Sequence, residues 1–71
     1  MQTNKLFYMA NQIASFFVTQ PGTDQAERVA AHMRDFWEPR MRDQFLIMID
    51  DGHEGLSPLA REAAELLRQP V

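Results

Sequence analysis

The middle of this chain reads Phe36-Trp37-Glu38-Pro39-Arg40-Met41-Arg42, and this segment predicts an interruption in the helical pattern. Pro39 has no backbone N–H, and its ring fixes φ and clashes with a preceding helical turn. The residue before a proline is also disfavoured in helical geometry, so Glu38 favours extended backbone. The segment therefore predicts that a helix ends or kinks near Glu38. The next helix is expected to open with Pro39 at its first position.

Two helical patterns lie before this segment. The first begins after Thr3 or Asn4, either of which can cap it, and it ends at the turn signal Pro21-Gly22. Thr23 or Asp24 caps the second. The apolar residues at helical spacing are Leu6, Ala10, Ile13 and Phe17 in the first helix, and Ala26, Val29, Ala30, Met33, Phe36 and Trp37 in the second.

Two further helices are predicted after residues 36–42. One runs from Pro39 to a stop at Gly52, and Ser57-Pro58 supplies a cap and a first helical residue for the other. No stretch alternates apolar and polar residues as a strand does. We predict an all-α fold, a compact bundle of three to four short helices, with residues 1–71 forming a single domain. The apolar positions are Met41, Phe45, Met48 and Ile49 in the third helix, and Leu59, Ala60, Ala63, Leu66 and Leu67 in the fourth.

The composition favours a small folded protein that gains stability from a partner. The chain has 71 residues, 45% of them hydrophobic, and no cysteine, so neither disulfides nor thiolate-bound metal can support its core. A core of this size leaves little free energy above the entropy of ordering the chain. The net charge of −3 disfavours a nucleic-acid partner. No apolar run reaches the roughly 18 residues of a membrane span, and the N-terminus lacks a signal-peptide layout, so we expect a cytoplasmic protein.

The predicted third helix carries its charges in the order that its dipole disfavours. Arg40 and Arg42 fall in its first turn, and Asp50 and Asp51 fall in its last. Three explanations are open. Glu38 pairs with Arg42 four residues further on, or the helix continues through the proline as a kink, or the charges meet a partner.

The partner explanation predicts a protein-binding surface on this segment, because Trp, Phe, Met and Arg are enriched at interface centres. A small bundle cannot bury every side of a helix, so Leu46 or Ile47 is expected at the surface. Trp37 has an alternative place in the chain's own core, because its helical position matches those of Ala26 and Ala30. The predicted partner-binding residues are Phe36, Trp37, Pro39, Arg40, Met41, Arg42, Leu46 and Ile47.

No group of residues indicates catalysis. The run 50–55 contains His53 between acids, but it lacks the oxygen ligands at alternate positions and the distal Glu of a calcium loop. It also has too few ligands for structural zinc. A loop between helices is the better interpretation. His32 lies at the edge of an apolar stripe, where an ordinary hydrogen bond is expected. Ser15 and Ser57 resemble a helix-surface residue and a cap, and no glycine-rich phosphate loop is present. We expect no catalytic, cofactor-binding or metal-binding residue in this chain.

Three segments together resemble a known family: residues 36–42, Met9-Ala10-Asn11-Gln12-Ile13-Ala14 and Gly55-Leu56-Ser57-Pro58-Leu59. They are similar to the small delta subunit of cytoplasmic, NAD-dependent, molybdenum-containing formate dehydrogenases, and the resemblance runs from about Lys5 to Leu67. It implies a non-catalytic accessory subunit that binds the molybdopterin-bearing catalytic alpha subunit and supports its assembly or stability. It also implies that the complex carries molybdopterin, iron–sulfur clusters and FMN, and that this chain holds none of them.

A second hypothesis is a free-standing helical adaptor or regulator that docks on an unrelated protein. Neither hypothesis gives the chain a nucleic-acid partner, a membrane or a small-molecule substrate of its own. Only the family resemblance separates the two. Identification of the protein that co-purifies with the native chain distinguishes them.

Overall fold

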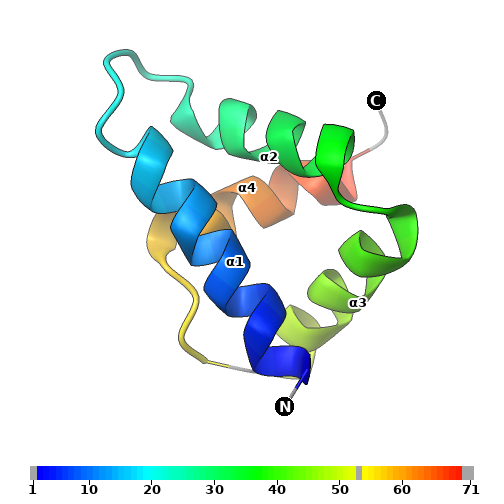
Figure 1. Cartoon of the computed structure of the whole chain (residues 1–71). Coiled ribbons are helices and arrows are strands. Elements are labelled where there is room, and N and C mark those ends of the chain that lie inside the picture. The colour runs from blue at the N-terminus through cyan, green and yellow to red at the C-terminus, as the bar shows by residue number, and fades with distance from the viewer. Residues whose placement is uncertain (1, 53, 70–71) are drawn as a thin grey trace.

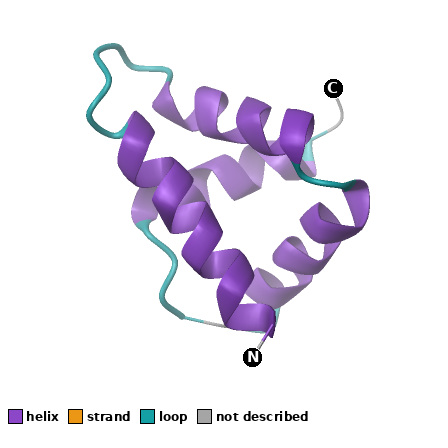
Figure 2. Cartoon of the chain, viewed as in Figure 1, coloured by secondary structure: helices purple, strands orange, loops and turns teal. Residues whose placement is uncertain are grey.

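Four helices dominate the computed structural model, which describes residues 2–52 and 54–69: α1 (Gln2–Phe17), α2 (Gln25–Phe36), α3 (Pro39–Asp50) and α4 (Pro58–Arg68). The most extensive packing is between α2 and α4, and α1 and α3 converge near the N-terminus (Figure 1). Loops join the helices, and no strand occurs among the described residues (Figure 2). The predicted all-α bundle is confirmed.

The break between α2 and α3 lies where Pro39 predicts it. Trp37 and Glu38 have extended backbone, with ψ angles of 137° and 151°, and Pro39 is the first residue of α3. The backbone N–H of Trp37 donates to the carbonyl oxygen of Met33 at 2.8 Å, and that of Arg42 donates to the carbonyl oxygen of Glu38 at 3.1 Å. Two separate helices therefore meet here, and the alternative of one kinked helix is wrong.

The N-termini of α2 and α4 are capped differently. Ser57 caps α4 as predicted, because its Oγ accepts a hydrogen bond from the backbone N–H of Ala60 at 3.2 Å. Asp24 is the N-cap residue of α2, but its carboxylate makes no capping bond. That carboxylate instead pairs with the Nε of Arg28 at 3.1 Å. The spacing of four residues thus favours an ion pair over the cap.

The outer limits of α1 and α3 test two further predictions. α1 begins at Gln2, so Thr3 and Asn4 lie inside the helix, and the prediction that one of them is the N-cap is wrong. No proline or glycine interrupts residues 2–17, so the helix extends further than the cap signal indicated. α3 ends at Asp50, and Gly52 follows with φ of +86°, a region that favours glycine. The predicted stop at Gly52 is confirmed.

One cluster of buried side chains joins all four helices. Phe45 of α3 is fully buried and meets Phe7 of α1 edge-on, with ring centroids 5.8 Å apart. It also meets Trp37 edge-on at 5.4 Å. Aromatic rings favour this geometry because the positive edge of one ring faces the negative face of the other. On α4 the buried residues are small, which allows close packing against α2: Ala60, Ala63 and Ala64.

The apolar stripe of α2 differs from the prediction at its C-terminal end. Phe36, predicted in the core stripe, is 73% exposed, whereas its neighbour Trp37 is only 5% exposed. The physical reason is that α2 ends at Phe36, and the extended backbone that follows turns Trp37 toward Phe45. The predicted inner face of α3 is confirmed, with these residues buried or partly buried: Met41, Phe45, Met48 and Ile49.

Candidate functional site

The segment between α2 and α3, residues 36–42, forms a bend that we call the elbow. Phe36 points outward from it, and Pro39 and Arg40 are exposed. The core alternative for Trp37 is confirmed, because its buried ring packs against Phe45. Trp37 therefore fixes the elbow to the core, and its ring is not offered to a partner.

The predicted partner-binding residues do not form one surface. Met41 lines a hollow on the flank of α3 that faces α1. Arg40 and Ile47 are exposed and stand seven residues apart, close to two helical turns, on one side of α3. A second hollow, of about 270 Å³, brings together three predicted residues and others from α2 and α4. We call it the arginine hollow, and its lining includes Arg34, Pro39, Arg42, Asp43, Leu46 and Leu67.

Arg42 is the most unusual side chain of the arginine hollow. Its Nε is buried and has no hydrogen-bond partner. None of the ion pairs among the described residues involves Arg42, so the explanation that the Glu38 carboxylate pairs with it is wrong. Glu38 contributes only its carbonyl oxygen, to the backbone N–H of Arg42. A buried donor without an acceptor costs about 1–3 kcal/mol. The terminal Nη groups of Arg42 also make no described hydrogen bond, and they belong to a partly exposed residue that an acceptor from outside the chain could reach.

Sequence reasoning missed Arg34 as a site residue. Its Nη2 donates to the carbonyl oxygen of Leu66 at 2.6 Å, so a side chain of α2 caps the C-terminal end of α4. A cation at this end of a helix is favoured by the helix dipole. The only signal in the sequence is the position of Arg34 in the last turn of α2, which does not reveal that it reaches α4.

Of the two acids at the end of α3, Asp50 has an internal partner, and Asp51 has no ion pair among the described residues. Arg68 of α4 donates to both carboxylate oxygens of Asp50, at 2.6 and 3.2 Å, and its Nε lies 3.4 Å from Glu65. The hydrogen bond from Arg68 and its positive charge hold the pKa of Asp50 below its ordinary value of 3.8. The same hydrogen bond raises the pKa of Arg68. Asp50 therefore links α3 to α4, and its place in the last turn needs no external partner.

A row of aromatic rings that sequence reasoning missed runs from α1 to the elbow. Phe16 contacts Phe17 with centroids 5.0 Å apart, Phe17 faces His32 at 6.4 Å, and His32 packs on Phe36 at 4.7 Å. These ring contacts take the place of the hydrogen bond expected for His32, whose ring has no hydrogen bond among the described residues. The sequence feature that indicates this contact is the spacing of four residues between His32 and Phe36, which puts both rings on one helix face.

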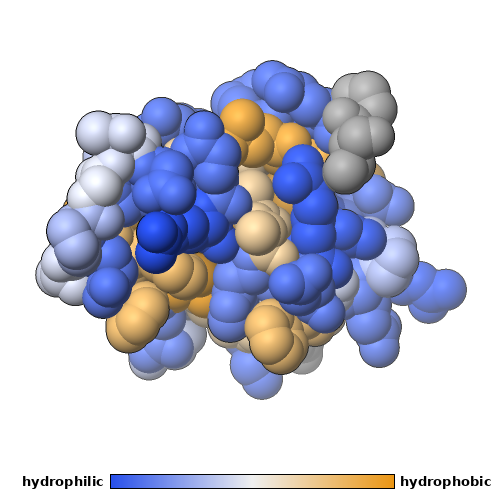
Figure 3. All heavy atoms as spheres, turned by 90° about the horizontal axis from the view of Figure 1, so that it is seen from above, coloured by the Kyte–Doolittle hydropathy of each residue, from blue (hydrophilic) through white to orange (hydrophobic). Residues whose placement is uncertain are grey.

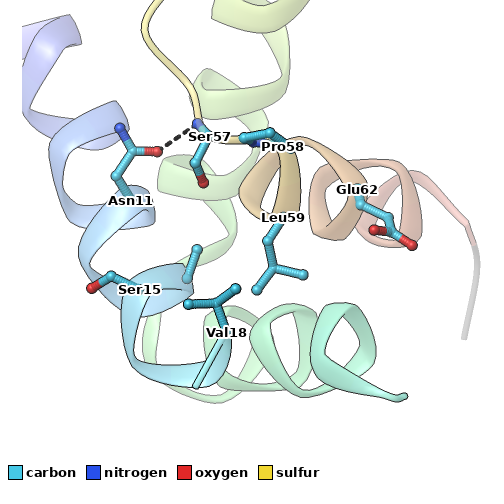
Figure 4. A pocket seen from close by; sticks show the side chains of 8 residues that line it. Asn11, Ser15, Val18, Ser57, Pro58, Leu59 and Glu62 are labelled. Carbon is cyan, nitrogen blue, oxygen red and sulfur yellow. Dashed lines mark hydrogen bonds between the residues drawn. The ribbon is translucent and has the colours of Figure 1, made fainter. Parts of the chain in front are cut away.

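A larger hollow, of about 470 Å³, lies between α1 and the start of α4 (Figure 4). Pro58 and Leu59 give it apolar walls. The amide side chain of Asn11, which also lines this hollow, is already hydrogen-bonded within the chain. It donates to the carbonyl oxygen of Gly55 at 2.7 Å and accepts from the backbone N–H of Ser57 at 2.8 Å. Small-molecule sites use a few polar groups to orient the ligand. Here the amide of Asn11 and the hydroxyl of Ser57 fix the loop before α4 instead.

In the acidic run 50–55, Asp50 is the last residue of α3, and the described residues after it, 51–52 and 54–55, form a loop as predicted. Arg68 binds Asp50, residues 51–52 form the turn after α3, and His53 lies outside the described residues. Within residues 2–52 and 54–69, no three His, Cys, Asp or Glu side chains are grouped so that they could hold a metal ion. In the same part of the chain, no helix has both the length and the apolar character needed to cross a bilayer.

These features define a small all-α bundle protein. A family model for the NADH-dependent formate dehydrogenase delta subunit FdsD matches residues 5–64 of the 71-residue chain. The chain therefore belongs to the family of formate dehydrogenase delta subunits, which confirms the resemblance in its sequence. No match was found among curated proteins or among solved structures.

Proposed function

We propose that this chain is a non-catalytic accessory subunit that binds the molybdopterin-bearing catalytic alpha subunit of a cytoplasmic, NAD-dependent formate dehydrogenase. In this role it supports the assembly or the stability of that subunit. The family match over residues 5–64 carries the proposal. It favours a place in the formate dehydrogenase complex over a free-standing adaptor on an unrelated protein.

The burial pattern supports a role without catalysis. Every buried residue in the described part of the chain is hydrophobic. Active sites shift the pKa values of their acids and bases by burial and by nearby charges, and such groups are absent from this core. The sequence contains no cysteine that could ligate iron–sulfur clusters. We accordingly assign molybdopterin, the iron–sulfur clusters and FMN to the other subunits.

The exposed residues of the elbow and of α3 supply the proposed binding surface. Phe36 and Ile47 offer large apolar side chains, exposed Arg40 offers positive charge, and Arg42 is partly buried. On the face seen in Figure 3, hydrophobic residues come through in separate areas among hydrophilic ones. Interfaces between separately folded proteins commonly have this mixed character. The proposed binding residues are therefore the predicted ones other than Trp37, and they lie on more than one side of the elbow and of α3: Phe36, Pro39, Arg40, Met41, Arg42, Leu46 and Ile47.

Expression of the formate dehydrogenase subunits with and without this chain tests the proposal. With an affinity tag on the catalytic subunit, we expect the chain to co-purify and its omission to lower the yield of assembled enzyme. The rate of formate-dependent NAD reduction per bound molybdenum should stay unchanged in the enzyme that does assemble. An unchanged yield, or formate oxidation by the purified chain alone, would contradict the proposal.

A further inference from the structure

We propose that the arginine hollow receives an acidic side chain, Asp or Glu, of the partner subunit. This inference rests on the proposed function and specifies where and by what chemistry the chain docks. The carboxylate of the partner accepts hydrogen bonds from Arg42 and Arg34, which reach the hollow from α3 and α2.

The two arginines of the hollow have donor groups without a described partner. Arg42 has a buried Nε without a partner, and Arg34 uses its Nη2 on Leu66, which leaves its other N–H groups available. Asp43 is the one carboxylate among its lining residues, and no described ion pair joins it to either arginine. The start of α3 adds positive potential, because Pro39 lines the hollow and Glu38 makes no side-chain cap. Neither arginine of the hollow is therefore paired with a carboxylate among the described residues.

The shape of the hollow favours a side chain over a free ion. The guanidinium fork matches the two oxygens of a carboxylate, and the aliphatic part of Glu or Asp can pack against apolar walls. Leu46 and Leu67 provide those walls. A small inorganic anion would gain nothing from the leucines. The fixed backbone at Pro39 also lowers the entropy lost when a partner binds beside it.

A binding titration tests the inference. The probe is the formate dehydrogenase complex purified without this chain, titrated with purified full-length chain. We expect Arg42→Gln to weaken association by about thirtyfold or more, because it removes one partner of a buried charged hydrogen bond. The matched control is Arg61→Gln, which removes the same charge from an exposed residue of α4 outside the hollow. It should bind like the wild type.

Salt dependence separates docking from a structural role. Wild-type affinity should fall with rising ionic strength more steeply than that of Arg42→Gln, since the variant keeps only the charge of Arg34 at the hollow. Far-ultraviolet circular dichroism checks that each variant is folded. If Arg42→Gln does not fold, Arg42→Lys decides, because lysine keeps the charge and cannot form the paired hydrogen bonds. If Arg42→Lys binds the complex more weakly than the wild type, the inference is supported. If Arg42→Lys binds as tightly as the wild type, the inference is overturned.

Three outcomes overturn the inference for different reasons. If wild type and Arg42→Gln bind the complex equally, the hollow is not the docking site, and the proposed function stands. If the wild-type chain does not bind the complex at all, the proposed function fails together with the inference. Binding of inorganic phosphate to the isolated wild-type chain, lost in Arg42→Gln and competing with the complex, would assign the hollow to a free anion instead.

Discussion

Phe45 is the residue on which the core most depends. It is fully buried and holds edge-on contacts with Phe7 of α1 and with Trp37 of the elbow. Each such pair contributes about 0.5–1.5 kcal/mol beyond the area that it buries. A single side chain thus ties α1, the elbow and α3 together, and the elbow keeps its position through Trp37.

We expect Phe45→Ala to abolish cooperative folding of the isolated chain. Loss of a buried Phe costs about 3–5 kcal/mol, which matches or exceeds the surplus stability of a core this small. Trp37 is the only tryptophan, so its fluorescence during urea unfolding reports directly on the elbow. Ile47→Ala, at an exposed position of the same helix, should change stability by no more than about 0.5 kcal/mol. Equal unfolding midpoints for the two variants would contradict this role of Phe45.

The pair of Asp50 and Arg68 predicts a dependence of stability on pH. The pKa of Asp50 is lower in the folded chain than in the unfolded chain. The pair therefore adds stability above the unfolded pKa, and this contribution disappears as the pH falls through the folded pKa. Urea midpoints measured from neutral to acidic pH should fall less steeply in Asp50→Asn than in the wild type. Asp51→Asn, whose carboxylate has no described ion pair, should follow the wild type, and parallel curves for all three would contradict the assignment.

At the scale of the helices, two similar capping signals in the sequence lead to different side-chain contacts at the starts of α2 and α4. Ser57 accepts from the backbone N–H of Ala60, whereas Asp24 makes no capping bond and pairs with Arg28 on the surface. A side-chain cap satisfies a helical N–H that would otherwise lack a partner. An exposed ion pair at this spacing adds only a few tenths of a kcal/mol.

We expect Ser57→Ala to lower the free energy of unfolding by about 1 kcal/mol and Asp24→Ala by about 0.3–0.5 kcal/mol. Urea unfolding followed by circular dichroism measures both. Added salt should reduce the effect of Asp24→Ala and leave that of Ser57→Ala in place, because screening weakens the ion pair alone. The reverse order of the two losses would show that the cap of α4 contributes less than its geometry indicates.

At the scale of the whole molecule, the size of the core sets the dependence on a partner. The radius of gyration of 11.2 Å is the value of a folded chain of this length. The described core nevertheless consists of few large side chains, and several buried positions are alanine. A domain of this size has little surplus stability alone.

Saturating formate dehydrogenase complex should raise the melting temperature of this chain by roughly 10–20 °C. A partner present at 100 times its dissociation constant adds about 2.7 kcal/mol, and each kcal/mol shifts a domain of this size by about 4–8 °C. Hydrogen–deuterium exchange at increasing temperature follows the peptides of this chain separately from those of the complex. An unrelated protein at the same concentration is the control. An unchanged melting temperature with the complex at saturation would contradict the expected stabilisation.

The sequence by itself determined the helices and most of their limits. Pro39 sets the start of α3, Ser57 the start of α4 and Gly52 the end of α3, because proline sterics, side-chain capping and positive φ act within a few residues. The periodicity of apolar residues likewise predicted the inner face of α3. Family membership also follows from the sequence, through segments that the family model matches as a whole.

Only the tertiary structure decided which surface residues lie together. Arg34 of α2 and Arg42 of α3 line the same hollow. Asp50 of α3 likewise pairs with Arg68 of α4. The choice between Phe36 outside and Trp37 inside also depends on where α2 ends relative to Phe45. Helical periodicity gives the direction of a side chain about its own axis, but not which neighbouring helix it faces. That is set by packing between helices distant in sequence, which local rules do not contain.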